Sequence, residues 1–129
     1  MKYLSEYMEA RQTVALDKAG AFFAFSKKQF EEKKVEGVKY VNLNMGMICP
    51  KDNAVTLLKE LDTIYRESIV QDIEENGLNA IIRRELNNHE AYYTGDIEST
   101  VDALSDYPVN QDDILAVFRN KNHEVEQIV

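Results

Sequence analysis

Apolar residues recur at helical spacing through the middle of the chain, over residues 51–76. Steps of three and four residues place them on one face of an α-helix, and most charged residues of the stretch, Asp72 among them, fall on the opposite face. Pro50 suits the first turn, and Gly77 ends the pattern because glycine readily adopts the left-handed conformation that closes a helix. We therefore predict a long central helix here. The residues predicted to face the core are Leu58, Leu61, Tyr65, Ile69 and Ile73, and the same face is widened by Val55, Leu57, Ile64 and Val70.

Shorter helical patterns flank the central helix on both sides. Before it, residues 2–18 keep roughly helical spacing and end near Gly20. Residues 27–36 form a mostly charged pattern, with Ser26 as the N-cap and Gln29 at the capping-box position. The predicted elements after the central helix are a helix over residues 78–90, a loop or extended bridge at 91–95, a helix between Asp96 and Pro108, and a helix capped by Asn110.

Two stretches have the pattern of β-strands. Residues 21–25, with the sequence AFFAF, are apolar and aromatic throughout, which suits a buried strand. In residues 38–49 apolar and polar residues alternate, the period of a half-buried strand, and Gly46 permits a turn or a bulge. The predicted fold class is α+β and helix-dominated. It has five to six helices around the central helix, with a small two- or three-stranded sheet, parallel or antiparallel, from these two stretches.

Length and composition predict a folded chain. A length of 129 residues is common for one domain and allows a sizeable core. A hydrophobic content of 44% and a charged content of 29% are those of a globular protein. Because no repeat or linker interrupts the chain, we predict a single compact domain over residues 1–129, with a frayed C-terminal tail from about residue 120.

Acidic residues are concentrated in the second half of the chain. The net charge is −8, and residues 85–118 contain eight Asp or Glu and no Lys or Arg. Such a segment suits a protein partner with a basic surface, although it also fits a solvated acidic face that keeps the protein monomeric. The charge disfavours nucleic acid as the main partner. The predicted partner-binding residues are Glu90, Tyr92, Tyr93, Asp96, Glu98, Asp102 and Asp106.

An alternative for the same region is a metal or acid/base site. Glu85 and His89 are four residues apart and share a face if the helix extends that far, and Glu90 and Asp96 follow closely. Imidazole and carboxylate groups are common ligands of divalent metal ions. The competing interpretation is a salt-bridged helix end. The region has neither an HExxH sequence nor paired Glu-x-x-His sequences, so no metal or other cofactor is the leading expectation.

Two further features have a functional and a structural interpretation. Cys49, the only cysteine, precedes the central helix, whose N-terminus could lower the pKa of a thiol, but a buried residue is the favoured interpretation. Lysines over residues 27–39 lie near aromatic residues, as in proteins that bind single-stranded nucleic acid. Glutamates in the same helix nearly neutralise them, which favours a solvated helix with salt bridges.

Nothing in the sequence specifies a catalytic residue, because it has no nucleotide-binding, hydrolase, kinase or paired-cysteine motif. A single cysteine, no signal-peptide pattern and no apolar run of membrane-spanning length indicate a cytoplasmic protein. The leading expectation is a small, acidic, non-catalytic interaction or regulatory protein of a bacterium, phage or other mobile element. The alternative is a small metal-dependent or acid/base enzyme that uses His89 and neighbouring carboxylates. The partner's identity and the oligomeric state stay open.

Overall fold

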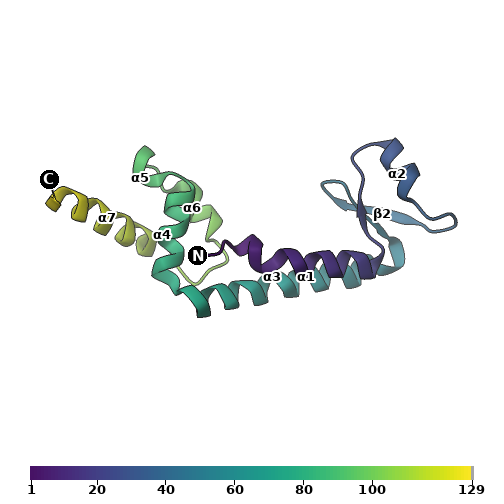
Figure 1. Cartoon of the computed structure of the whole chain (residues 1–129), viewed down its shortest axis with the longest axis horizontal. Helices are drawn as coiled ribbons and strands as arrows, with labels where there is room; N and C mark the ends of the chain where they lie inside the picture. Colours follow the sequence, from purple (N-terminus) through teal and green to yellow (C-terminus); the bar gives the residue numbers. More distant parts are fainter. Residues whose placement is uncertain (129) are drawn as a thin grey trace. The chain divides into compact units, whose positions relative to one another are not determined.

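Helices dominate the fold, and a small antiparallel sheet accompanies them (Figure 1). The structure, a computed structural model, describes the backbone of residues 1–128 and the side chains of residues 1–120. Its helices are α1 (Leu4–Ala19), α2 (Lys27–Lys33), α3 (Ala54–Asn76), α4 (Leu78–Asn88), α5 (Ala91–Thr94), α6 (Glu98–Ala103) and α7 (Gln111–Ile128). The prediction of a helix-dominated α+β chain is confirmed. Over the described residues, no helix combines the length and the apolar character needed to traverse a bilayer.

The chain divides into two compact units. The N-terminal unit comprises residues 2–68, and the C-terminal unit begins at Ile69, so α3 contributes residues to both. The prediction of one compact domain over residues 1–129 stays a prediction. The predicted fraying from about residue 120 also stays one, because the backbone of α7 is helical to Ile128 while the later side chains and Val129 lie outside the described residues.

Three strands in the order β1-β3-β2 form the sheet of the N-terminal unit. They are β1 (Phe22–Phe23), β2 (Tyr40–Asn44) and β3 (Met47–Pro50). Both pairings are antiparallel, which resolves the direction that the sequence left open. The stretch 38–49 is therefore a hairpin with its turn at Met45 and Gly46, in agreement with a turn at Gly46. The register pairs Ile48 with Phe22 on one side and with Asn42 on the other.

The sheet, α1 and the first part of α3 enclose the core of the N-terminal unit. Ala15, Cys49, Leu57 and Ile64 are all buried and belong to one cluster. Helices α1 and α3 run antiparallel beside each other (Figure 1). The end of α1 meets the start of α3, where Asn53 Nδ2, just before α3, donates to the carbonyl oxygen of Ala19 at 2.9 Å. The prediction that Cys49 is buried is confirmed, and burial raises the pKa of its thiol, which disfavours a reactive thiolate.

The buried face of α3 matches the predicted one only in part: Leu57, Ile64 and Ile69 are buried as predicted, whereas Val55 and Val70 are exposed. Leu58 is 50% exposed, whereas its neighbour Leu57 is 1% exposed, so the prediction that Leu58 faces the core was wrong. Asp72 was placed on the outer face but is fully buried. The physical reason is that α3 has apolar residues on more than one face and polar residues on its buried face. Its buried residues are Ala54, Leu57, Ile64, Ser68, Ile69 and Asp72.

Helix α4 is the centre of the C-terminal unit and contacts α5, α6 and α7. Its residues Ile81, Ile82 and Leu86 are almost completely buried. The predicted cap of α7 is confirmed, because Asp113 N–H donates to Asn110 Oδ1 and Asn110 N–H donates to Asp113 Oδ2, both at 2.9 Å. Helix α5 is a single turn where a loop or extended bridge was predicted, and this turn raises the helix count to seven in the described chain.

Candidate functional site

A buried ion pair joins α3 and α4 inside the C-terminal unit. Arg84 Nη1 donates to Asp72 Oδ1 at 2.8 Å, and Nη2 donates to Oδ2 at 3.0 Å. Two further donors reach the same carboxylate: the Tyr107 hydroxyl donates to Oδ2, and Asn76 Nδ2 donates to Oδ1 at 2.8 Å. Four donors thus satisfy a carboxylate whose side chain is completely removed from solvent.

The electrostatics of this cluster favour charged Asp72 and neutral Tyr107. Burial alone would raise the pKa of Asp72, but the hydrogen bonds from Arg84, Tyr107 and Asn76 outweigh it, so the net pKa is lowered. Desolvation and the adjacent carboxylate raise the pKa of Tyr107 well above its usual range. Because the Arg84 and Asp72 side chains are only 5% and 0% exposed, we interpret the cluster as a structural link. It connects α3, α4 and the segment that follows α6.

The predicted acidic residues lie in the C-terminal unit, on or beside α5 and α6. Glu90, Asp96, Glu98 and Asp102 are exposed. Among the described residues, none of these four carboxylates forms an ion pair with a Lys, Arg or His. We call residues 90–106 the acidic segment. The charge of these four carboxylates therefore faces solvent, and no ion pair within residues 1–120 neutralises it.

Hydrogen bonds fix the local shape of the acidic segment. Asp96 Oδ1 accepts from the backbone N–H of Glu98 at 2.9 Å, at the start of α6. Thr94 Oγ1 accepts from Asp96 N–H at 3.1 Å. Glu90 has a φ of 56°, in the left-handed region, and precedes the single turn of α5. Asp96 therefore has a structural role as well as a charge.

The two tyrosines of the predicted binding set have different environments. The ring of Tyr92 stacks on Phe118 of α7, with centroids 5.3 Å apart and planes 15° apart, and is half-buried. Tyr93 is 92% exposed. Together with Asn87 and Glu90 they line a pocket of about 380 Å³. Tyr93 is thus available for contact with a partner, whereas Tyr92 holds α5 against α7.

The residues of the alternative metal site are not brought together as a ligand group. Glu85 is half-buried, with Oε2 at 3.9 Å from Arg84 Nε, and His89 follows the end of α4. Within residues 1–120, no group of three or more His, Cys, Asp or Glu side chains is arranged to hold a metal ion. The set Glu85, His89, Glu90 and Asp96 is therefore not such a group.

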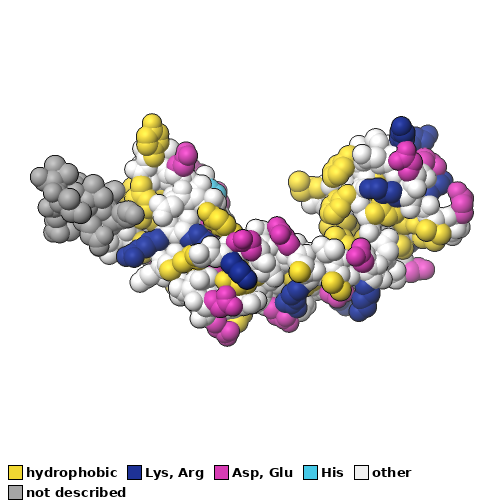
Figure 2. Space-filling view, viewed as in Figure 1, with side chains coloured by type: hydrophobic (Ala, Val, Ile, Leu, Met, Phe, Trp, Pro, Cys, Tyr) yellow, Lys and Arg dark blue, Asp and Glu magenta, His cyan; other side chains and the backbone are white. Residues whose placement is uncertain are grey.

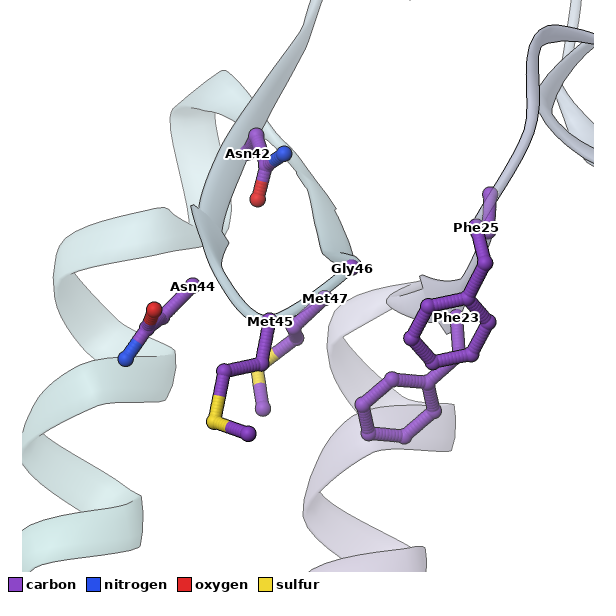
Figure 3. A pocket seen from close by; sticks show the side chains of 8 residues that line it. Phe23, Phe25, Asn42, Asn44, Met45, Gly46 and Met47 are labelled. Carbon is purple, nitrogen blue, oxygen red and sulfur yellow. The ribbon is translucent and has the colours of Figure 1, made fainter.

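A second exposed surface, in the N-terminal unit, was not predicted. Residues 21–25 were expected to be a buried strand, but only Phe22 and Phe23 form β1, and Phe23 and Phe25 are 41% and 74% exposed. Met45, at the turn of the hairpin, is 82% exposed. The available signal was the Met-Gly pair at the turn, because the first position of a tight hairpin turn usually carries Asn, Asp or Gly. Phe23, Phe25 and Met45 line a pocket of about 780 Å³ (Figure 3).

The chain belongs to a family of unknown function, DUF7659, whose model matches residues 4–124. The match includes most of both compact units. No curated protein and no solved structure matches the chain.

Proposed function

We propose that the chain is a small, non-catalytic interaction protein of the bacterial or phage cytoplasm, and that it binds a basic protein partner through its acidic segment. One observation carries this proposal: Glu90, Asp96, Glu98 and Asp102 are exposed and have no cationic partner among the described residues. Carboxylates of this kind repel one another, and Glu90, Glu98 and Asp102 contribute little to the stability of the monomer. A basic partner would remove that repulsion and be attracted over about 8–10 Å, the Debye length in physiological salt.

The exposed ring of Tyr93 supports the same proposal. An aromatic side chain that is 92% exposed provides a large contact area with few rotatable bonds, and such residues are common energetic centres of protein interfaces. Asp72, a carboxylate with a perturbed pKa, is buried and fully hydrogen-bonded. That arrangement favours a structural role for it over an open acid/base centre.

The test is charge reversal at two exposed acidic residues of α6, Glu98→Lys with Asp102→Lys. Partners of the parent are first captured from a host extract with the purified chain and identified by mass spectrometry. The association rate of each basic partner is then measured against ionic strength. We expect the parent's rate to fall steeply with salt, and the variant to associate at least tenfold more slowly at low salt with a weaker salt dependence.

A matched control separates a local effect from a change in net charge. Glu9 and Glu32 are exposed and form no ion pair among the described residues, so Glu9→Lys with Glu32→Lys changes the net charge equally. This control should associate at close to the parent's rate. Equal rates for the α6 variant and the parent at every salt concentration would exclude the acidic segment as the binding site.

A further inference from the structure

The hairpin of the N-terminal unit carries an exposed apolar surface. We define the hairpin surface as the exposed residues Phe23, Phe25 and Met45 together with Met47, which line one pocket with Asn42 and Asn44. Figure 3 shows the two phenylalanine rings on one side of the pocket and the side chains of Met45 and Met47 on the other. Exposed apolar residues that gather in this way are typical of an interaction site, whereas single scattered ones are not.

The five neighbouring aromatic residues fall into two groups. Phe22, Phe30 and Tyr40 pack against one another, with ring centroids 5.5–6.3 Å apart. Phe23 and Phe25 instead stack on each other in solvent, with centroids 6.2 Å apart and planes 7° apart. The first group stabilises the fold by holding α2 against the sheet. The second group leaves two large rings exposed to water.

The turn of the hairpin holds Met45 in a costly conformation. Met45 and Gly46 have φ values of 47° and 82°, so both central residues are in the left-handed region. A residue other than glycine is unfavourable in such a conformation, and Asn or Asp is better tolerated there than Met. A strained methionine in solvent contributes little to folding, which favours a role in contact with another molecule.

Gly46 allows one ring to lie directly against the turn. A Cβ atom at Gly46 would lie 2.6 Å from Cε1 of Phe25 and 3.1 Å from the carbonyl oxygen of Ala24. The Ala24 N–H also donates to the Gly46 carbonyl at 2.9 Å, which ties this segment to the turn. The ring of Phe25 is therefore held in place by the hairpin, and the surface is largely formed before any partner binds.

Positive charge accompanies the hairpin surface. Lys33 Nζ donates to the carbonyl oxygen of Phe23 at 2.7 Å, which places an ammonium group at the backbone of this surface. Residues 20–51 contain six lysines and three glutamates. Among the described residues only Lys34 of these six forms an ion pair, with Glu31 and Glu36, so the other five ammonium groups are outside such pairs, and the stretch has a net charge of +3 (six lysines minus three glutamates). Figure 2 shows Lys or Arg side chains among and beside the hydrophobic ones on this unit.

We propose that the hairpin surface binds an acidic peptide segment with large apolar side chains. The apolar side chains would occupy the pocket between the phenylalanines and methionines, and the carboxylates would face the lysines. A symmetric contact with a second copy would bring lysines against lysines, which disfavours it. Methionine-rich walls are typical of surfaces that accept varied apolar peptides, and the side chains of Met45 and Met47 on one side of the pocket do not provide the aromatic stacking surface that single-stranded nucleic acid uses. This site is distinct from the acidic segment, which would bind a basic partner.

The test is a selection from a random twelve-residue peptide library on the immobilised parent protein. We expect the selected peptides to combine Asp or Glu with at least two large apolar residues. Synthetic copies should bind less tightly as salt is raised. The Met45→Asn and Phe25→Ala variants should each weaken binding at least tenfold. Since Asn suits the turn, loss of binding in Met45→Asn cannot be attributed to misfolding, which circular dichroism would verify.

Controls distinguish this site from the acidic segment. Tyr93→Ala removes a more exposed aromatic ring from the C-terminal unit and should leave peptide binding unchanged, as should the Glu98→Lys, Asp102→Lys variant. Selected peptides without acidic residues, no enrichment at all, or equal binding to Met45→Asn and Phe25→Ala would each overturn the proposal. Phe25-dependent binding of oligo(dT) would assign the surface to nucleic acid instead. Self-association that Met45→Asn abolishes in sedimentation velocity would assign it to a second copy.

Discussion

Arg84 binds both carboxylate oxygens of Asp72, and neither side chain is more than 5% exposed. A pair of this kind stabilises a structure only while both partners are present. The desolvation cost of each charge is offset by the other, so removal of one leaves an uncompensated buried charge. The pair therefore constrains the C-terminal unit, and its stability should depend on both residues jointly.

The first prediction concerns this pair. Arg84→Met should lower the free energy of unfolding by about 3–5 kcal/mol, because it leaves the buried carboxylate of Asp72 without its cation. The measurement is urea-induced unfolding followed by circular dichroism at pH 7. The double variant Arg84→Met, Asp72→Leu removes both charges and should be more stable than Arg84→Met alone. If the double variant lost as much free energy of unfolding as Arg84→Met and Asp72→Leu lose together when each is measured alone, the two residues would not interact.

The second prediction concerns pH. The pKa of Asp72 is lowered in the fold, so its stabilising contribution is present above the unfolded-state pKa of about 3.9 and is lost as the pH falls through the folded value. The pKa of Tyr107 is raised, so its contribution is present below about 10, the unfolded-state pKa, and is lost as the pH rises further. The urea midpoint should therefore be constant at intermediate pH, fall at acidic pH because of Asp72, and fall above about pH 10 because of Tyr107.

Tyr107→Phe provides the control for the alkaline side. It removes the hydroxyl that donates to Asp72, and at pH 7 this should cost about 1.5–3 kcal/mol, the usual value for a hydrogen bond to a charged group. Above pH 10 the parent should lose stability faster than the variant, so the gap between their midpoints should narrow. A gap of constant size from pH 7 to pH 11 would contradict a raised pKa for Tyr107.

The sequence predicts the local parts of this fold well. Helix spacing and caps depend on residues within four positions of each other. Asn110 and Asp113 form both expected hydrogen bonds, and Ser26 Oγ accepts from Gln29 N–H as expected, although the Gln29 side chain accepts from Phe25 N–H. Long-range partners are different. The ion pair joins residues 12 positions apart, and the Tyr107 hydroxyl reaches Asp72 across 35 positions. No local pattern encodes such contacts.

The two candidate sites also differ in how well the sequence predicts them. Exposure of the acidic residues follows from their charge alone, since unpaired carboxylates are rarely buried. The hairpin surface was missed because an apolar run such as AFFAF usually predicts burial, and only the three-dimensional pairing shows which rings face inward. Phe22 is opposite Ile48 and packs with Tyr40, whereas Phe25 lies beyond the end of β1 and against the turn.

The third prediction tests the register of α3. Leu57 is 1% exposed and belongs to the core of the N-terminal unit, so Leu57→Ala should cost about 2–5 kcal/mol. Leu58→Ala, at a position that is 50% exposed, should cost less than about 1 kcal/mol. The measurement is urea unfolding of both variants under identical conditions. Equal losses, or a larger loss for Leu58→Ala, would return Leu58 to the core face, as first predicted from the sequence.

The last prediction concerns the strained turn. Met45→Asn should raise the free energy of unfolding by about 1 kcal/mol, because Asn tolerates a positive φ and the exposed methionine has little packing to lose. Gly46→Ala should have the opposite effect, since its Cβ atom would meet the ring of Phe25 at a φ where side chains are already unfavourable. The measurement is the denaturant midpoint of each variant. Val55→Asn, at an exposed position of α3, is the control, and it should show no comparable gain. If Met45→Asn proved clearly less stable than the parent, methionine would be contributing to the fold, and its exposure would no longer favour a role in binding.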